Sequence, residues 1–263
     1  MLMPMGLARR KAKEDNFCMS IEKRNFPQFF ITNASPCPYL PGQMERKVFT
    51  HLMGNDARAL NSQLSQSGFR RSQNIAYRPA CDGCSACTST RVPVDSFHWT
   101  KSFRRVLREN SDVVATVTQP RATTEHYELF RAYVDTRHYD GGMADMSVLD
   151  FAAMIDESVV DTRLVEYRFD RHHERGGELI GCVLIDLLVD GLSLIYSFYE
   201  PGLERRSLGT HMILDGILRC QRLKLPYLYL GYMVPGSRKM AYKARFLPQE
   251  RLSTSGWKLI SRS

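Results

Sequence analysis

Alternating apolar and polar residues predict a run of three strands in the second half of the chain. In the third strand, Leu192 and Leu194 point to one face while Ser193 points to the other. Asp190-Gly191, between the last two strands, is a strong hairpin signal. The predicted strands cover residues 162–169, 179–189 and 192–199, with a further short strand from residue 227. This run predicts a mostly antiparallel sheet.

Helical periodicity, with apolar residues three or four apart, precedes and follows these strands. The predicted helices cover residues 124–138, 147–157 and 207–222. A last, basic helix is expected to begin at Ser237, a natural N-cap, and it places Lys239 and Lys243 on one face. From residue 124 onward the order is helix-helix-strand-strand-strand-helix-strand-helix. We therefore expect an α/β (α+β) fold with a mixed, mostly antiparallel sheet flanked by helices.

The first half of the chain mixes strand and helix signals. A helix predicted over residues 45–67 buries Val48, Leu52 and Leu60 on one side, and a basic helix is predicted over residues 101–109. The predicted strands of this half cover residues 28–32, 75–77, 90–94 and 113–117.

The length of 263 residues suits one large domain or two small ones, and Pro120 marks a boundary. The expected division is a flexible basic tail at 1–25, an amino-terminal half at 26–119, a carboxyl-terminal half at 120–250 and a tail at 251–263.

Charge and cysteine content narrow the class of protein. Lys plus Arg exceed Asp plus Glu by 36 to 28, and this net charge of +8 favours a polyanionic partner such as nucleic acid. We expect no membrane span, because no run of about 18 apolar residues exists. Seven cysteines, an odd number, indicate reduced thiols and a cytoplasmic protein.

The segment Arg206-Ser-Leu-Gly-Thr210 lies between a strand and a helix. Free amide groups at a helix N-terminus favour an anion, although Ser207 can be a plain N-cap and Gly209 a packing choice. The turn resembles the phosphate loop of the acetyltransferase superfamily. Its final Gly or Ala is missing, since His211 follows Thr210, which argues against coenzyme A.

Several separated motifs carry a closer resemblance. They are Pro36-Cys-Pro-Tyr-Leu-Pro-Gly42, Tyr77-Arg-Pro-x-Cys-x-x-Cys-x-x-Cys87, Tyr196-x-Phe-x-x-Pro201 and Ser237-x-Lys-Met-x-Tyr-Lys-x-x-Phe-x-Pro248. In this order they resemble the aminoacyl-tRNA–protein transferases of the N-degron pathway, and most closely the bacterial aspartate/glutamate leucyltransferases. The similarity spans about residues 28 to 250.

The resemblance implies an enzyme that moves leucine from leucyl-tRNA to the α-amine of proteins beginning with Asp or Glu. It also implies two acetyltransferase-like (GNAT-like) halves and no coenzyme A or other required cofactor. Arginyl transfer by the same fold is the nearest alternative, because the sequence alone barely reveals the donor pocket. A leucine side chain requires apolar pocket walls, whereas an arginine side chain requires acidic ones. A non-catalytic RNA-binding protein is an alternative of another class. The oligomeric state stays open.

The resemblance to the acetyltransferase superfamily implies that two neighbouring strands, near residues 196–199 and 228–231, splay apart and hold the acyl donor. Tyr232 or Asp186 could assist proton transfer, although both residue types are more often structural. The donor end is assigned to Lys239, Lys243, Arg206, Ser207, Gly209 and Ser237. The acceptor carboxylate is best bound by a bidentate guanidinium, and Arg78 and Arg91 are the candidates. The alternative for either arginine is a solvated surface charge.

Four cysteines could form a metal site. Cys81, Cys84 and Cys87 lie within seven residues, and Cys37 in a separate Pro-rich loop would complete a four-thiolate zinc or iron–sulfur site. The alternative is a set of reduced structural thiols beside the acceptor pocket.

Overall fold

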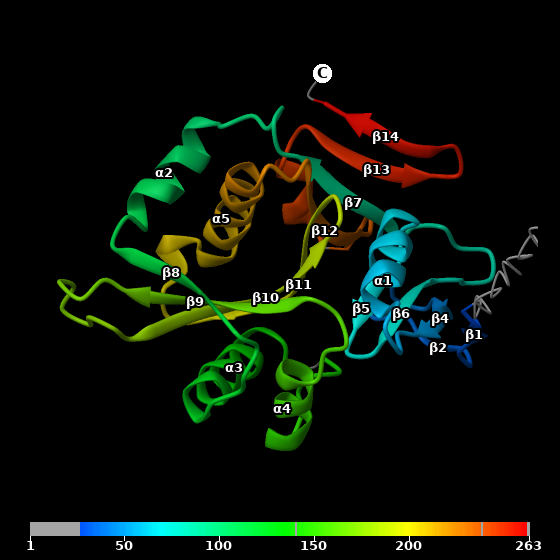
Figure 1. Ribbon diagram of the computed structural model, residues 1–263, viewed down its shortest axis with the longest axis horizontal. Helices are drawn as coiled ribbons and strands as arrows, with labels where there is room; N and C mark the ends of the chain where they lie inside the picture. The colour runs from blue at the N-terminus through cyan, green and yellow to red at the C-terminus, as the bar shows by residue number, and fades with distance from the viewer. Residues whose placement is uncertain (1–26, 140, 238, 262–263) are drawn as a thin grey trace, which may run out of the picture.

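The computed structural model describes residues 27–139, 141–237 and 239–261, so the predicted basic tail at 1–25 lies outside the described residues. An eight-stranded sheet forms its centre (Figure 1). Its strands are β7 (Thr88–Pro93), β8 (Val113–Thr118), β9 (Thr162–Phe169), β10 (Leu179–Leu188), β11 (Gly191–Tyr199), β12 (Tyr227–Met233), β13 (Gln249–Ser253) and β14 (Gly256–Ile260). Their order is β14-β13-β7-β12-β11-β10-β9-β8, and every neighbouring pair except β11–β12 is antiparallel. The predicted mixed, mostly antiparallel sheet is confirmed.

Helices cover both faces of this sheet. They are α2 (Lys101–Glu109), α3 (Thr124–Arg137), α4 (Val148–Asp156) and α5 (Leu208–Leu223). In Figure 1, α2 and α5 lie on one face, and α3 and α4 lie on the other. The central strand β10 serves both layers, because Ile180 and Val183 join the α5 side while Cys182 and Leu184 join the α3 side. None of the helices in the described part of the chain combines the length and apolar character that crossing a bilayer requires.

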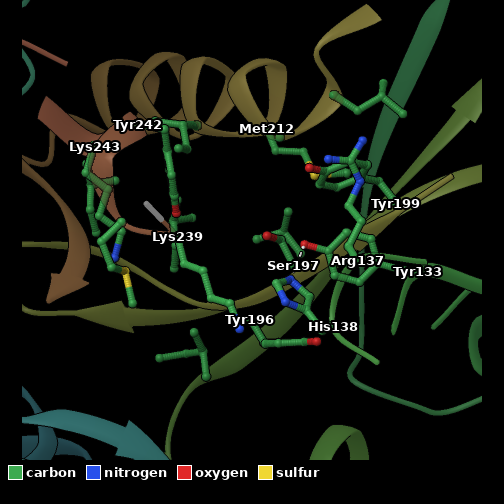
Figure 2. A pocket seen from close by; sticks show the side chains of 18 of the residues that line it. Tyr133, Arg137, His138, Tyr196, Ser197, Tyr199, Met212, Lys239, Tyr242 and Lys243 are labelled. Carbon is green, nitrogen blue, oxygen red and sulfur yellow. Dashed lines mark hydrogen bonds between the residues drawn. The ribbon is translucent and has the colours of Figure 1, made fainter. Parts of the chain in front are cut away.

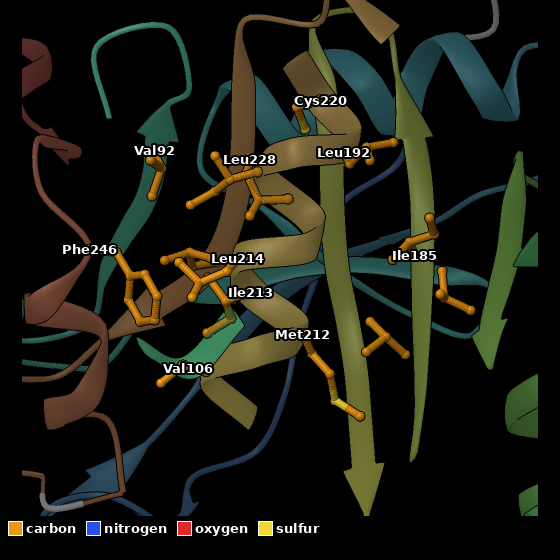
Figure 3. Packing of buried hydrophobic residues seen from close by; sticks show 14 of the residues in the cluster. Val92, Val106, Ile185, Leu192, Met212, Ile213, Leu214, Cys220, Leu228 and Phe246 are labelled. Carbon is orange, nitrogen blue, oxygen red and sulfur yellow. The ribbon is translucent and has the colours of Figure 1, made fainter. Parts of the chain in front are cut away.

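The core under α5 fixes the N-terminus of that helix. Met212, Leu214 and Cys220 are at most 2% exposed and pack against the sheet (Figure 3). Phe246, from beyond β12, stacks on Phe103 of α2 with ring centroids 5.2 Å apart. Removing buried side chains of this size typically costs about 2–5 kcal/mol, so α5 has little freedom to shift.

A smaller four-stranded sheet lies beside the large one. Its order is β1 (Phe30–Ile31), β4 (Lys47–His51), β6 (Ile75–Pro79) and β5 (Arg70–Ser72), with α1 (Ala57–Gln66) nearby and a two-stranded pair of β2 (Ser35–Pro36) and β3 (Met44–Glu45). The helix predicted over residues 45–67 is therefore wrong in its first part. Val48, Phe49 and Thr50 are β-branched or aromatic and favour a strand. Because β4 pairs with both β1 and β6, residues distant in sequence settle its conformation.

The large sheet draws strands from both predicted halves. β7 lies between β12 and β13, and β8 forms the edge beside β9. Residues 251–260, expected to be a tail, form most of the β13–β14 hairpin at the other edge. One sheet thus connects segments that the sequence divided at Pro120.

The segment after β12 is compact and only partly helical. It contains a five-residue 3₁₀ helix, η2 (Ala241–Arg245), whose N-cap Met240 makes no side-chain cap hydrogen bond. The basic helix predicted from Ser237 is wrong, because the Ser237 amide donates to Val234 O in a tight turn. The chain then returns within a few residues to bury Phe246 and enter β13, which leaves no length for a longer helix.

Candidate functional site

The parallel neighbours β11 and β12 stay paired for only three residues. Gly191, Leu192 and Ser193 pair with residues 227–229, and beyond that point the strands diverge. On its other side, β11 has a register shift against β10 that leaves Ile195 as a bulge. This divergence agrees with the splay expected near residues 196–199 and 228–231.

A cavity of about 660 Å³ opens where the strands diverge (Figure 2). Its apolar and aromatic walls include Tyr133, Leu194, Tyr196, Met212, Ile213 and Leu230. In Figure 2, Lys239, Tyr242 and Lys243 face Arg137 and His138 across the opening, with α5 along one side. The site therefore combines an apolar interior with cationic groups around it.

Arg70 of β5 fills the gap between the diverging strands. Its Nη2 donates to Leu194 O at 3.1 Å and also to Ile195 O, while Nη1 donates to Leu230 O at 3.4 Å. The guanidinium thus replaces part of the hydrogen bonding that the two strands no longer exchange. No motif in the sequence singled out Arg70.

Gly231 makes room for this guanidinium. Its φ is +73°, a conformation that favours glycine, and a Cβ there would lie 1.5 Å from Arg70 Nη1. The close approach of a side chain from the small sheet therefore explains why β12 has a glycine at position 231, where its register against β7 shifts.

The two lysines expected at the donor end both line the cavity, in different environments. Lys239 is exposed at the opening and keeps its place as a candidate for the tRNA end. Lys243 is only 4% exposed, and its Nζ donates to Tyr232 O at 2.6 Å. Burial and the charge of Arg70 lower the pKa of Lys243 well below its usual value. An amine whose charged form is disfavoured in this way is a poor partner for a phosphate.

The other donor candidates divide in the same way. Ser207 and Gly209 line the cavity at the start of α5, whereas Ser237 is buried in the turn after β12. Ser207 has a left-handed conformation and makes no side-chain cap bond. Arg206 forms a two-bond ion pair with Asp112, at 2.7 and 2.8 Å, so its guanidinium is engaged within the fold.

The two candidates for proton transfer lie in different places. Tyr232 lines the cavity, but its hydroxyl lies 2.9 Å from Gly68 O and 3.0 Å from Tyr77 O, and burial raises its pKa. Asp186 is fully buried and binds Arg71 with both carboxylate oxygens, away from the residues that line the cavity. Its position is that of a structural ion pair.

Neither arginine expected at the acceptor side lines the cavity. Arg78 is exposed, and its guanidinium lies 5.2 Å from the ring centre of Phe69. Arg91 is buried, donates to Glu250 at 2.7 Å and lies 3.6 Å from the ring centre of Tyr227. The structure instead brings Arg137 to the opening, which the sequence did not single out.

The four cysteines of the proposed metal site do gather in space. Cys37, Cys81, Cys84 and Cys87 line a cavity of about 50 Å³ behind Tyr232. Burial and the three neighbouring thiols raise the pKa of Cys87 to about 11. Yet no three histidine, cysteine or acidic residues within the described ranges are arranged to hold a metal ion. As placed, the four thiols do not form a ligand set.

Comparison with known proteins agrees with the sequence motifs. Residues 35–105 match the family described as arginine-tRNA-protein transferase, N terminus, and residues 125–253 match its C terminus. The aspartate/glutamate leucyltransferase of Azorhizobium caulinodans is 57% identical over 247 residues, or 92% of this chain and 99% of the relative. That of Xanthobacter autotrophicus is 56% identical over 249 residues, covering 93% and 100%.

Solved structures show only a weak likeness. The structure of L-PGS from Bacillus licheniformis has a TM-score of 0.44 at 10% identity, over 57% of this chain and 46% of that one. FemX has a TM-score of 0.40 at 11% identity, over 70% and 62%. The family rests instead on sequence. Since two matched regions cover most of the chain and the relatives align almost end to end, the chain belongs to the arginine-tRNA-protein transferase family.

Proposed function

We propose that this protein transfers leucine from leucyl-tRNA to the α-amine of cytoplasmic proteins that begin with Asp or Glu. The observation that carries the choice of leucine is the apolar interior of the cavity. Among the described residues that line it, Glu204 is the one carboxylate, and it lies 3.7 Å from Arg137 in an ion pair. An arginyl side chain would meet aliphatic and aromatic walls there, without a free carboxylate to pair with its charge.

The chemistry needs positioning more than a strong catalyst. The aminoacyl ester is already activated, and an α-amine has a pKa near 7.7–8.0, so much of it is uncharged at neutral pH. Holding the amine against the ester carbonyl therefore supplies a large part of the rate. The wall between the diverging strands is where we place the ester, next to the cationic Arg70. No coenzyme A is required.

Two anions need cationic partners at the opening. We assign the tRNA backbone to the exposed Lys239 and to the start of α5 at Ser207 and Gly209. We assign the acceptor carboxylate to Arg137, because its ion pair with Glu204 is long and an incoming carboxylate can replace it. Arg137 therefore takes the role that the sequence suggested for Arg78 and Arg91.

The direct test is transfer to a short peptide. The purified protein is incubated with leucyl-tRNA or arginyl-tRNA and a peptide beginning with Asp, and the added mass is measured. We expect leucine to be transferred more than about 100-fold faster than arginine, because an unpaired buried charge costs several kcal/mol. A peptide beginning with Asn and an acetylated peptide are the controls, and both should react poorly. Equal transfer of arginine would refute the donor assignment, and tRNA binding without any transfer would indicate an RNA-binding protein.

We also propose that the cysteine cluster is a set of reduced thiols and that no metal is required. The anaerobically purified protein should contain far less than one zinc or iron per chain by elemental analysis, and Cys84→Ser should keep its transfer activity. The reason is that the four thiols share a cavity without the arrangement of a ligand set. One metal ion per chain, lost in Cys84→Ser, would contradict this expectation.

A further inference from the structure

An amine in the cavity wall has no anionic partner. Lys243 Nζ makes one hydrogen bond, to the Tyr232 carbonyl oxygen, and no carboxylate among the described residues forms an ion pair with it. Lysines are almost never fully buried as ammonium groups without a partner. Yet Lys243 lines the cavity in which the proposed reaction occurs. Its environment suits an uncharged amine that exchanges a proton with bound substrate.

The charge beside this amine belongs to Arg70. A guanidinium stays protonated at any working pH, and this one is held by three backbone carbonyls. Burial first and Arg70 second lower the pKa of Lys243. The backbone oxygen of Tyr232 accepts from the amine, and the ring centre of Tyr242 lies 5.9 Å from it. Neither residue supplies an opposing charge, because burial raises the pKa of both phenols. Lys239 lines the same cavity and adds another positive charge.

We propose that the uncharged amine of Lys243 carries a proton from the attacking nitrogen to the leaving ribose oxygen, and that Arg70 is the positioning residue that keeps this amine uncharged. The inference rests on the proposed function and deepens it. It also reassigns Lys243, which the sequence placed at the tRNA backbone, to the acyl-transfer step itself.

The step balances without an outside acid or base. The neutral α-amine attacks the ester carbon, and the new N–C bond gives an adduct with a cationic nitrogen and an anionic oxygen. Lys243 takes one proton from that nitrogen. The anionic oxygen re-forms the carbonyl while the bond to the ribose oxygen breaks, leaving its electron pair on that oxygen. Lys243 then returns the proton to it, so the products are an amide and a free ribose hydroxyl.

Two substitutions separate this role from phosphate binding. Lys243→Met removes the amine at similar volume, and Lys243→Arg replaces it with a permanent cation. We expect kcat to fall by about 10²–10⁴-fold in both, as for loss of general acid–base catalysis, with tRNA affinity within about twofold of the parent. Lys258→Met and Lys258→Arg, on the exposed face of β14, are the matched controls and should react normally. Weaker tRNA binding by Lys243→Met with normal turnover by Lys243→Arg would overturn the proposal.

The role of Arg70 has a pH signature. At saturating substrates, kcat should rise with pH as Lys243 loses its proton. Arg70→Gln removes the neighbouring positive charge. Without that charge the ammonium form of Lys243 is more stable, so the rise in kcat should move to higher pH. Arg70→Lys keeps a charge and should leave the rise near its original position. A rise at the same pH in Arg70→Gln would overturn the positioning role.

A stability measurement tests the uncharged state without reference to activity. The unfolded lysine binds a proton below a pKa of about 10.4, whereas the native amine is already uncharged well below that value. The free energy of unfolding therefore decreases as pH falls, because the unfolded chain binds a proton that the native protein does not. In urea unfolding from about pH 6 to pH 10, the parent should gain free energy of unfolding relative to Lys243→Met as pH rises. A constant difference would overturn the inference, whereas absent leucyl transfer by the parent would refute only the proposed function.

Discussion

Asp186→Asn is expected to lower the free energy of unfolding by about 3–5 kcal/mol, the usual cost of leaving one partner of a buried ion pair unpaired. Arg71 donates to Asp186 from Nε at 2.5 Å and from Nη2 at 2.7 Å, and both side chains are 1% exposed. Thr162 donates to the same carboxylate at 2.7 Å. Neutralising the carboxylate therefore strands the Arg71 charge in the interior. Urea unfolding at neutral pH measures the loss.

The same variant decides whether Asp186 takes part in the reaction. At a temperature at which parent and variant are both folded, kcat should be unchanged, since Asp186 does not line the cavity. Asp112→Asn is the matched control for the loss of stability. The Asp112 side chain is 34% exposed in its pair with Arg206, and exposed pairs contribute at most about 1 kcal/mol to the free energy of unfolding. A large loss of kcat in Asp186→Asn, with stability intact, would restore a role in proton transfer.

Gly231→Ala should have the largest effect on the site. The added Cβ would lie 1.5 Å from Arg70 Nη1, so the guanidinium must leave the carbonyls of Leu194 and Leu230. Each hydrogen bond from a charged donor contributes about 1.5–3 kcal/mol, and the positive φ adds about 1 kcal/mol. We expect a loss of about 3 kcal/mol or more in stability. Transfer should fall by roughly 100-fold or more, because small displacements in a reaction site can cost that much.

Gly177→Ala separates backbone strain from displacement of Arg70. Gly177 has a φ of +82°, close to that of Gly231, but a Cβ there would meet nothing within 4 Å. It should therefore show only the strain, about 1 kcal/mol, with normal transfer. If the two alanine variants lost the same stability and activity, the account of Arg70 as the group that occupies the strand gap would be wrong.

Local patterns predicted most of the carboxyl-terminal elements. The hairpin at Asp190-Gly191 and the helix after residue 207 lie where expected, because turn chemistry and periodicity act over a few residues. The strand at Lys47–His51 was missed, since its partners β1 and β6 come from other parts of the chain. Short-range patterns do not record such pairing.

The location of the cavity was predictable from the sequence, but the contacts and burial of its charged side chains were not. The cavity between the diverging strands and the lysine at its opening lie where the motifs placed them. The contact of Arg70 with Leu230 spans 160 residues of sequence and that of Arg71 with Asp186 spans 115, and nothing local distinguishes these two arginines from solvated ones. Likewise, Lys239 and Lys243 look alike in sequence, and only packing makes one exposed and the other buried.

The placement of β7 has a consequence for synthesis of the protein. Residues Thr88–Pro93 pair with β12 on one side and β13 on the other. This segment of the first half therefore cannot complete its pairing until both later strands have been synthesised. Contacts of such long range are slow to form. During synthesis, the edges of β7 stay unpaired until the residues of β13, near position 250, have left the ribosome. Unpaired strand edges are prone to aggregation during this interval.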